Sequence, residues 1–470
     1  MRNSIKRAVI GAALAMVSLS AAQAETLGEA LTGAYMSSGL IEQNRAVLRA
    51  ADEDVAQAVA ALRPVVSWTT TASRRYGTNG SFNAFGALVE SDARNQTFSI
   101  EIAAQATLYA GGANLLGIEA AKQSVLATRS SLIGVEQDVL LQGVSAFMEM
   151  RRAIENVALR ENNVRVIGEE LRAARDRFEV GEVTRTDVAL AEARLASAQS
   201  DLAAAQGSLA IATEAYIAAV GRAPVNPVAP TSLPSLPAGE AGAKAIALRN
   251  HPDIISAQHQ VAAADLSVRI AEAALGPNVT LRGTYGRTEN FDDDSFTRGG
   301  TVSLTTSIPL YQGGQLASLV RDARASRDQS RAGLHLTRIA VEQSVGNAYA
   351  QLRVAQATTE AVRAEVAAAT VAFRGVREEA TLGARTTLDV LDAEQELLDA
   401  RARQVSAQVD ETIAAYAVLA SIGQLTASDL RLPVPDYDPA AYYNMVKDAP
   451  AAISKQGLEL DRVLRALGKE

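Results

Sequence analysis

Apolar residues recur at intervals of four and three along a long stretch of the first half of this chain. That spacing is typical of a coiled-coil seam on one face of a helix. Residues 112–180 contain no proline, and one helix of that length would extend roughly 100 Å at about 1.5 Å per residue. The pattern therefore predicts one very long helix with the seam Val139, Ala146, Met150, Ala153, Val157, Val164, Ile167, Leu171 and Ala174.

A tight turn and a returning helix follow this seam. Glycine accepts the left-handed conformation in which many helices end, so we expect the first helix to end at Gly181. Either Thr184 or Thr186 is placed to cap the start of the next helix. Large residues then alternate with alanine, which predicts close packing along Val188, Ala191, Leu195, Ala198, Leu202, Ala205, Leu209, Ala212, Tyr216 and Ala219.

The same pattern recurs 202 positions later in the chain. Gly181 corresponds to Gly383, and Asp187 corresponds to Asp389. A repeat of this length without a gap indicates two copies of one structural unit. The second seam comprises Val341, Val345, Ala348, Leu352, Ala355, Thr359, Val362, Val366, Ala369, Phe373 and Val376.

Each copy also contains segments in which apolar and polar residues alternate. Such a period of two predicts strands with one apolar and one polar face, here in hairpin regions at 65–109 and 278–310. Polar loops are predicted at 77–95 and 287–299. The offset between copies is 213 before the hairpins and 202 after them, so the first hairpin region is 11 residues longer. Insertions of this kind belong in exposed loops.

Helices are also predicted before each hairpin region. Residues 26–62 and 243–275 are alanine-rich, and Pro64 or Pro277 follows each stretch. Proline cannot continue a helix, so each stretch is predicted to form one helix that ends there.

These boundaries predict four parts of the chain. A basic start, an apolar core and Ala22-Gln23-Ala24 indicate a secretory signal peptide over residues 1–24. The first structural repeat takes residues 25–227, with its turn at Gly181, and the second takes 228–428, with its turn at Gly383. A C-terminal tail over 429–470 contains a short helical run at 458–467 and shows no reason to enter a core. The two expectations for this tail are that it wraps around the long helices or that it is partly disordered.

Composition excludes several kinds of chemistry. The chain has no cysteine, which excludes disulfides, thiolate metal sites and a lipidated N-terminal cysteine. Three histidines are scattered without a metal-binding spacing, so we expect neither a metal nor a cofactor. Removing the three basic residues of the signal changes the formal charge from −8 to −11, which argues against nucleic acid. No other run of 18 apolar residues predicts a membrane-spanning helix.

Four strands with one apolar face pose a problem of closure. Open sheet edges are not tolerated in lipid, and membrane barrels have at least about eight strands. Two or three identical chains would close a barrel, and a cyclic assembly achieves this economically. The predicted fold class is therefore mainly α, with long antiparallel coiled-coil helices forming an α-barrel and four strands per chain contributing to a transmembrane β-barrel.

Two other classes of protein remain as alternatives. A soluble periplasmic coiled-coil scaffold or adaptor would keep its hairpins in water, but it leaves their apolar stripes unexplained. An enzyme could use paired carboxylates, as glycoside hydrolases do. Aromatic residues make up only 4% of the chain, so the aromatic platforms that such sites usually contain are not evident. We therefore expect that the protein is not an enzyme.

Two segments resemble a known family. Ser-Ile-Pro-Leu-Tyr-Gln-Gly-Gly at 307–314 and Leu-Gly-Ala-Arg-Thr-Thr-Leu-Asp-Val-Leu-Asp at 382–392 are similar to the TolC-type outer-membrane efflux and secretion duct family, the outer membrane factors. The likeness extends over residues 26–430. Because the chain has no cysteine, it is similar to the branch of the family that is not lipidated. It implies a homotrimer with a twelve-stranded barrel in the outer membrane and a helical periplasmic tunnel.

The resemblance also implies partners. Such ducts export substrates in type I secretion or multidrug efflux. They dock to a periplasmic adaptor, the membrane fusion protein, and through it to an inner-membrane ABC or RND-type pump. The turns at Gly181 and Gly383 are the implied adaptor-docking sites.

Four residues are implied to form an entrance gate and selectivity site. Asp187 and Arg385 match the two sides of a latch ion pair. Asp389 and Asp392 match the narrowest ring, share a helical face at i and i+3, and would form a candidate cation-binding ring of six carboxylates in a trimer. Repulsion within that ring would raise some of their pKa values. The alternative interpretation is a solvated acidic face.

One departure affects the gate. Ala380 stands where the family has a latch tyrosine. The hydrogen bond of that tyrosine is therefore missing, and how the closed gate is held is open.

Overall fold

The chain, in a computed structural model that describes residues 24–92, 94–293 and 295–466, consists of two compact units. The helical unit comprises the chain up to Arg45, Ser130–Ile255 and Leu336–Tyr437. The sheet unit comprises Ala46–Arg129, Ser256–His335 and the chain from Asp438. The predicted signal peptide, except for Ala24, lies outside the described residues.

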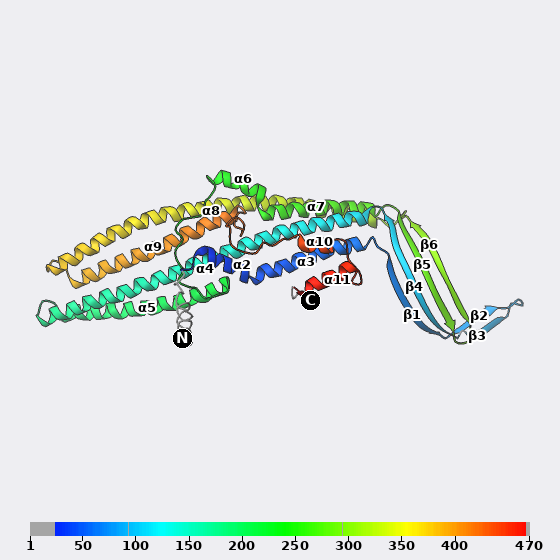
Figure 1. Cartoon of the computed structure of the whole chain (residues 1–470), viewed down its shortest axis with the longest axis horizontal. Coiled ribbons are helices and arrows are strands. Elements are labelled where there is room, and N and C mark those ends of the chain that lie inside the picture. The colour runs from blue at the N-terminus through cyan, green and yellow to red at the C-terminus, as the bar shows by residue number, and fades with distance from the viewer. Residues whose placement is uncertain (1–23, 93, 294, 467–470) are drawn as a thin grey trace, which may run out of the picture. The chain divides into compact units, whose positions relative to one another are not determined.

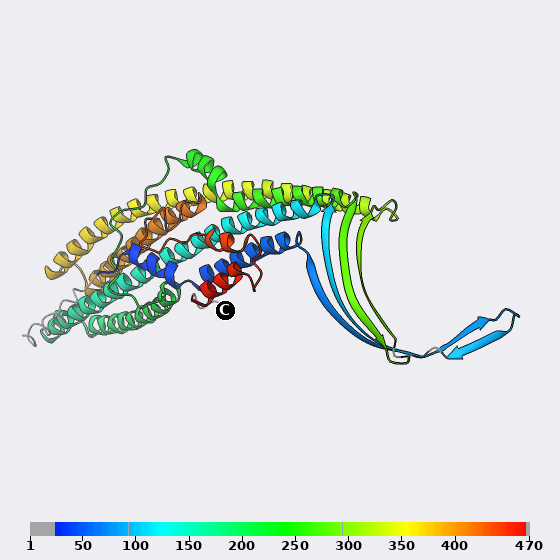
Figure 2. The ribbon, with the colours of Figure 1, turned by 45° about the vertical axis from the view of Figure 1, so that its right-hand side comes forward.

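Two pairs of antiparallel helices dominate the helical unit (Figures 1 and 2). The first helix of each pair covers 67 residues without a break, and its bounds recur at the offset of 202. The unit contains α2 (Leu27–Ser37), α5 (Arg185–Val220), α6 (Glu240–Asn250), α9 (Thr387–Ser421) and the larger parts of α4 (Ala113–Glu179) and α8 (Gln315–Thr381). None of the described helices is long and apolar enough to cross a membrane.

The predicted seams hold these helices together. In the described chain Val345, Ile167 and Leu171 are at most 5% exposed, as expected for seam positions. One apolar cluster joins three helices, because Ile167 and Leu171 of α4 pack with Ala191 of α5 and Leu391 of α9. Ala191 of α5 is fully buried in this cluster. Its small side chain lets α5 lie close to the other two helices.

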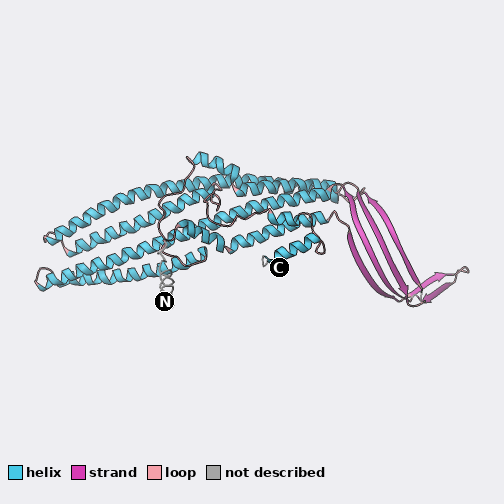
Figure 3. Ribbon diagram, viewed as in Figure 1, coloured by secondary structure: helices cyan, strands magenta, loops and turns pink. Residues whose placement is uncertain are grey.

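One four-stranded antiparallel sheet forms the strand part of the sheet unit (Figure 3). Its order is β1-β4-β5-β6, so β1 and β6 are the edges. Large apolar side chains lie uncovered on it, with Trp68 70% and Val302 81% exposed. The strands are β1 (Val65–Arg75), β4 (Asn95–Ala110), β5 (Asn278–Asn290) and β6 (Phe296–Ser307).

The two predicted loops of the hairpin regions were wrong in different ways. The segment 77–95 contains a further hairpin of β2 (Thr78–Phe82) and β3 (Leu88–Asp92). Most of 287–299 continues the strands β5 and β6, with Arg287 opposite Arg298. Polar composition was misleading here, because a strand that is not buried on either face can carry polar residues on both.

The predicted alanine-rich helices are each two helices. Residues 26–62 form α2 and α3 (Gly39–Ala60), which are separated by an extended Ser38. Residues 243–275 form α6 and α7 (Pro252–Ala273), separated by an extended His251. Proline at 252 disfavours a helical conformation at the residue before it, which explains the second break.

The C-terminal tail from Asp438 belongs to the sheet unit and packs within it, contrary to the expectation that the tail would not enter a core. Its helices are α10 (Ala441–Val446) and α11 (Lys455–Ala466). Val446 is fully buried. The Tyr442 hydroxyl donates to Glu53 of α3 at 2.6 Å, and the Arg129 guanidinium lies 5.3 Å from the centre of the Tyr443 ring.

Candidate functional site: the turns between paired helices

The turns α4–α5 and α8–α9 are built alike and lie at the same end of the helical unit (Figure 1). Gly181 has a φ of 82° and Gly383 a φ of 79°, in the left-handed region that glycine adopts without strain. The Gly181 N–H donates to the Phe178 carbonyl at 3.1 Å, and the Gly383 N–H donates to the Ala380 carbonyl at the same distance. These bonds satisfy carbonyls at each helix end.

Each returning helix begins with the same capping box. Asp187 Oδ2 accepts from the Thr184 N–H at 2.9 Å and from its hydroxyl at 2.8 Å, while the Asp187 N–H donates to Thr184 Oγ1 at 3.3 Å. Asp389 and Thr386 repeat this arrangement at 2.9, 2.9 and 3.2 Å. Two of the four predicted gate residues therefore stabilise helix starts.

Hydrogen bonding also sets the charge of these carboxylates. Donation from the Thr184 backbone, and then from its side chain, holds the pKa of Asp187 below its ordinary value. Thr386 lowers the pKa of Asp389 in the same way. Both side chains are therefore ionised at neutral pH, where the helix dipole also favours negative charge. Within one chain, the pKa of Asp389 is lowered rather than raised.

Arg385 pairs with a different carboxylate from the one implied by the resemblance. Its Nε donates to Glu379 Oε2 at 2.9 Å, which raises the pKa of the guanidinium. No ion pair between Asp187 and Arg385 exists among the described residues of the single chain. Both nevertheless line one cavity of about 550 Å³ between the turns, the turn cavity, together with the buried Ala380.

Asp392, the fourth predicted gate residue, joins the two helix pairs. Its Oδ1 lies 2.8 Å from Arg194 Nη2 of α5, and both side chains are about half exposed. Asp389 and Asp392 do share α9, but each carboxylate already has a partner within the chain. An exposed pair of this kind contributes about 0–1 kcal/mol.

Sequence reasoning missed a buried acidic pair near the turns. Glu394 of α9 is 5% exposed and Glu170 of α4 is 9% exposed. Burial raises the pKa of Glu394, and Arg377 of α8 lies 3.3 Å from Glu170. The signal was present, because Glu394 occupies a seam position between Leu391 and Leu397. Over the described residues, no three histidine or acidic side chains are placed to hold a metal.

The sequence matches the family described as "Outer membrane efflux protein" over residues 34–222 and 245–424. It is 34% identical to the outer membrane efflux protein BepC of Brucella suis over 91% of this chain and 92% of that protein. It is 25% identical to the alkaline protease secretion protein AprF of Pseudomonas aeruginosa over 63% of each chain. The fold is similar to the outer membrane protein VceC of Vibrio cholerae, with a TM-score of 0.70, 22% identity and coverage of 84% and 96%.

Proposed function

Since this chain belongs to the outer membrane efflux protein family, a family of outer-membrane efflux and secretion channels, we propose that it forms a homotrimeric export duct. The protein is located in the outer membrane, as its relatives are. The family's members are channels rather than enzymes. The trimer, the partners and the transported substrates belong to the proposal.

The observation that carries the trimer is the open sheet of the sheet unit. Its edge strands β1 and β6 have no strand partner on their outer sides among the described residues. Unpaired backbone groups are not tolerated in lipid, so a membrane sheet must close on itself. Three copies would supply twelve strands, with β1 of each copy beside β6 of the next. The exposed apolar side chains would then face lipid.

An export duct in the outer membrane requires partner proteins that supply energy. A channel in the outer membrane needs energy from elsewhere, and relatives are named for efflux and for protease secretion. We infer docking of a periplasmic adaptor at the turns around Gly181 and Gly383, and through it an inner-membrane ABC or RND-type pump. The two equal capping boxes support this, because they would present similar docking sites.

Native mass of the detergent-extracted mature protein tests the trimer. The full chain has a mass of 49.3 kDa, and we expect three mature chains per particle. A monomer that stays in solution without detergent would contradict the duct and favour a soluble periplasmic scaffold.

The gate is a second part of the proposal. We infer that Asp187, Arg385, Asp389 and Asp392 surround the entrance and that loosening their contacts opens it. Arg385→Ala is expected to raise single-channel conductance in a planar bilayer, because it removes a side chain that lines the turn cavity and pairs with Glu379. Arg374→Ala, at an exposed arginine of α8 outside that cavity, is the matched control. Conductance equal to that of the wild type would contradict the gate.

Selectivity tests the acidic ring separately. Asp389→Ala combined with Asp392→Ala is expected to reduce cation selectivity, seen as a changed reversal potential in a salt gradient. Asp392→Ala alone leaves the Thr386–Asp389 capping box intact and so separates loss of charge from loss of the helix start. An unchanged reversal potential in the double variant would exclude the ring.

A further inference from the structure

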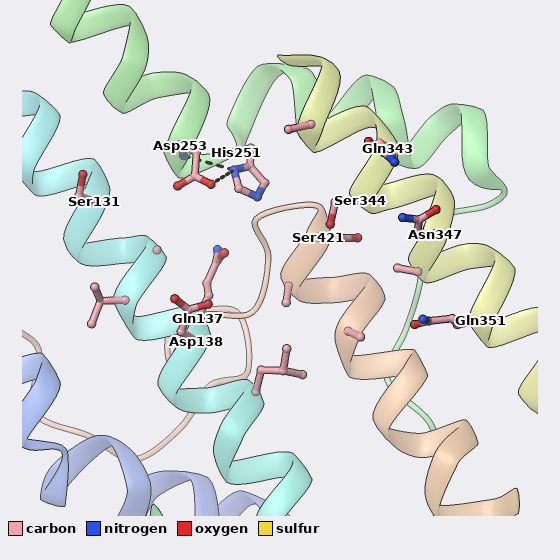
Figure 4. A pocket seen from close by; sticks show the side chains of 17 residues that line it. Ser131, Gln137, Asp138, His251, Asp253, Gln343, Ser344, Asn347, Gln351 and Ser421 are labelled. Carbon is pink, nitrogen blue, oxygen red and sulfur yellow. Dashed lines mark hydrogen bonds and ion pairs between the residues drawn. The ribbon is translucent and has the colours of Figure 1, made fainter. Parts of the chain in front are cut away.

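A cavity of about 700 Å³ lies in the helical unit where α6 gives way to α7. This junction cavity is separate from the turn cavity and has no part in the proposed gate. Side chains from α4, α8, the end of α9 and the α6–α7 junction line it (Figure 4). The lining residues used below are Gln137, Asp138, His251, Asp253, Gln343 and Asn347.

The titratable groups of the lining are two carboxylates and one imidazole. Asp138 and Asp253 both face the cavity, and its described lining includes no lysine or arginine. The Asp253 backbone N–H lies 3.2 Å from His251 Nδ1 and donates to it, and Asp253 Oδ2 lies 3.7 Å from the same nitrogen. Burial lowers the pKa of His251. Burial, and then the charge of Asp253, raises the pKa of Asp138. A cation between the two carboxylates would therefore stabilise the ionised form of Asp138.

A buried amide in the same cavity is unpaired. Gln137 is 4% exposed, and its side chain points from α4 toward the space below His251 (Figure 4). Its Nε2 has no hydrogen-bond partner among the described residues. A buried donor without an acceptor costs free energy, so an oxygen atom in the cavity would be stabilised there.

The fold does not require these polar groups. The helices α2 and α3 have the same bounds as α6 and α7 at an offset of 213, and α4 has the same bounds as α8 at an offset of 202. The corresponding positions of the other copy carry no charge: Ser38 for His251, Leu40 for Asp253, Ile339 for Gln137 and Ala340 for Asp138. The α2–α3 junction, whose helices have the same bounds, therefore forms without an acidic pair or a buried amide.

We propose that the junction cavity binds a small amino alcohol. Its ammonium group would lie between Asp138 and Asp253 and donate charge-assisted hydrogen bonds to both carboxylates. A hydroxyl oxygen would accept from Gln137 Nε2. The amides of Gln343 and Asn347 on α8 offer further donors and acceptors for other hydroxyls. An ammonium fits better than a metal ion, because the described residues do not bring three metal ligands together here.

Calorimetric titration of the full detergent-extracted protein tests this site. The probe is 1-amino-1-deoxysorbitol, and sorbitol is its neutral match. We expect saturable binding of the amine and none of sorbitol. Asp138→Asn with Asp253→Asn should weaken the binding roughly tenfold or more, because each charge-assisted bond is strong. Gln137→Leu should weaken binding of the amine as well.

Controls make the result decisive. Asp176→Asn removes the same charge from an exposed position of α4 outside the cavity and should leave binding unchanged. If the double variant does not assemble, Asp253→Asn alone gives the test, since this side chain is 61% exposed. Equal binding of sorbitol, equal loss in Asp176→Asn, or no binding to the wild type would each overturn the proposal. In the last case the cavity holds water only.

Discussion

Asp187 and Asp389 show how a residue acquires its role from its immediate neighbours. Each binds the threonine three positions earlier, and each is half-buried. The spacing Thr-x-x-Asp is visible in the sequence and resembles the capping box. That Thr184 rather than Thr186 caps the helix depends on the turn conformation, which one glycine sets. Substitution of either aspartate therefore affects a helix start as well as the proposed gate.

Asp52 is a residue whose burial could not be predicted. Its side chain is 1% exposed, neither oxygen has a hydrogen-bond partner among the described residues, and Arg129 Nη2 lies 3.9 Å away. Its counterpart Asp265 is 44% exposed and lies 3.1 Å from Arg331. Beside Asp52, the C-terminal tail places Tyr443 over Arg129, and nothing in the sequence of α3 indicates that contact.

A pH-dependent stability of α3 follows from this burial. Desolvation raises the pKa of Asp52 from 3.8 to about 6, so the folded chain binds this proton more tightly than the unfolded chain. Local stability should fall as pH rises from about 4 to about 6 and then stay constant, a loss of roughly 3 kcal/mol at most. Hydrogen exchange of α3 amides across this range measures it.

Asp52→Asn should remove that dependence and slow exchange above pH 6. Asp265→Asn is the control and should leave the exchange of α3 unchanged, because Asp265 lies on α7 beside Arg331. The same pH dependence in Asp52→Asn and wild type would show that another group titrates.

At the scale of elements, the contact between helix pairs rests on few side chains. Leu391 of α9 is 4% exposed and packs in the cluster with Ile167 and Leu171 of α4 and Ala191 of α5. Leu391→Ala should cost about 2–5 kcal/mol, because it leaves a cavity in this cluster. Faster hydrogen exchange in α5 and the first turns of α9 would report it. Leu388→Ala, at a 39% exposed leucine of the same helix, should have little effect.

The period of apolar residues predicted some elements well and others poorly. The long helices were predicted almost to the residue, because a seven-residue repeat runs through them and a glycine follows each one. Strand periodicity failed at 287–299, where both faces of the sheet are exposed in the chain and nothing enforces alternation. The breaks at Ser38 and His251 were missed although Gly39 and Pro252 follow them, because each stretch was read as one helix that ends at the later proline.

At the scale of the whole molecule, the edge strands β1 and β6 each need a strand from another copy to close the sheet. The polar face of β1 includes Thr71, and the polar face of β6 includes Thr301, Ser303 and Thr305. The family and the fold were recognisable from motifs and periodicity. The number of copies was implied only by the resemblance, because closure depends on contacts that one chain does not contain.

Disulfide cross-linking tests that closure directly, since the chain has no cysteine of its own. Thr71→Cys is combined with one cysteine at alternate residues of β6 from Thr297 to Ser307. At least one combination should give covalent dimers and trimers on oxidation, because neighbouring strands lie about 4.8 Å apart. Thr71→Cys alone should not give trimers. Absence of cross-links at every register would contradict β1–β6 pairing between copies.

The equal bounds of α4 and α8 have an evolutionary consequence. If the chain arose by duplication of one half, each half has since accepted many substitutions in these helices but no net change in length. A deletion in one helix alone would move its turn away from the other turn, so length changes survive only when matched. The hairpin regions are free of this restriction, and the first is longer and contains the extra hairpin of β2 and β3. New length should therefore accumulate at the strand end of such proteins, while the helices diverge only in side chains.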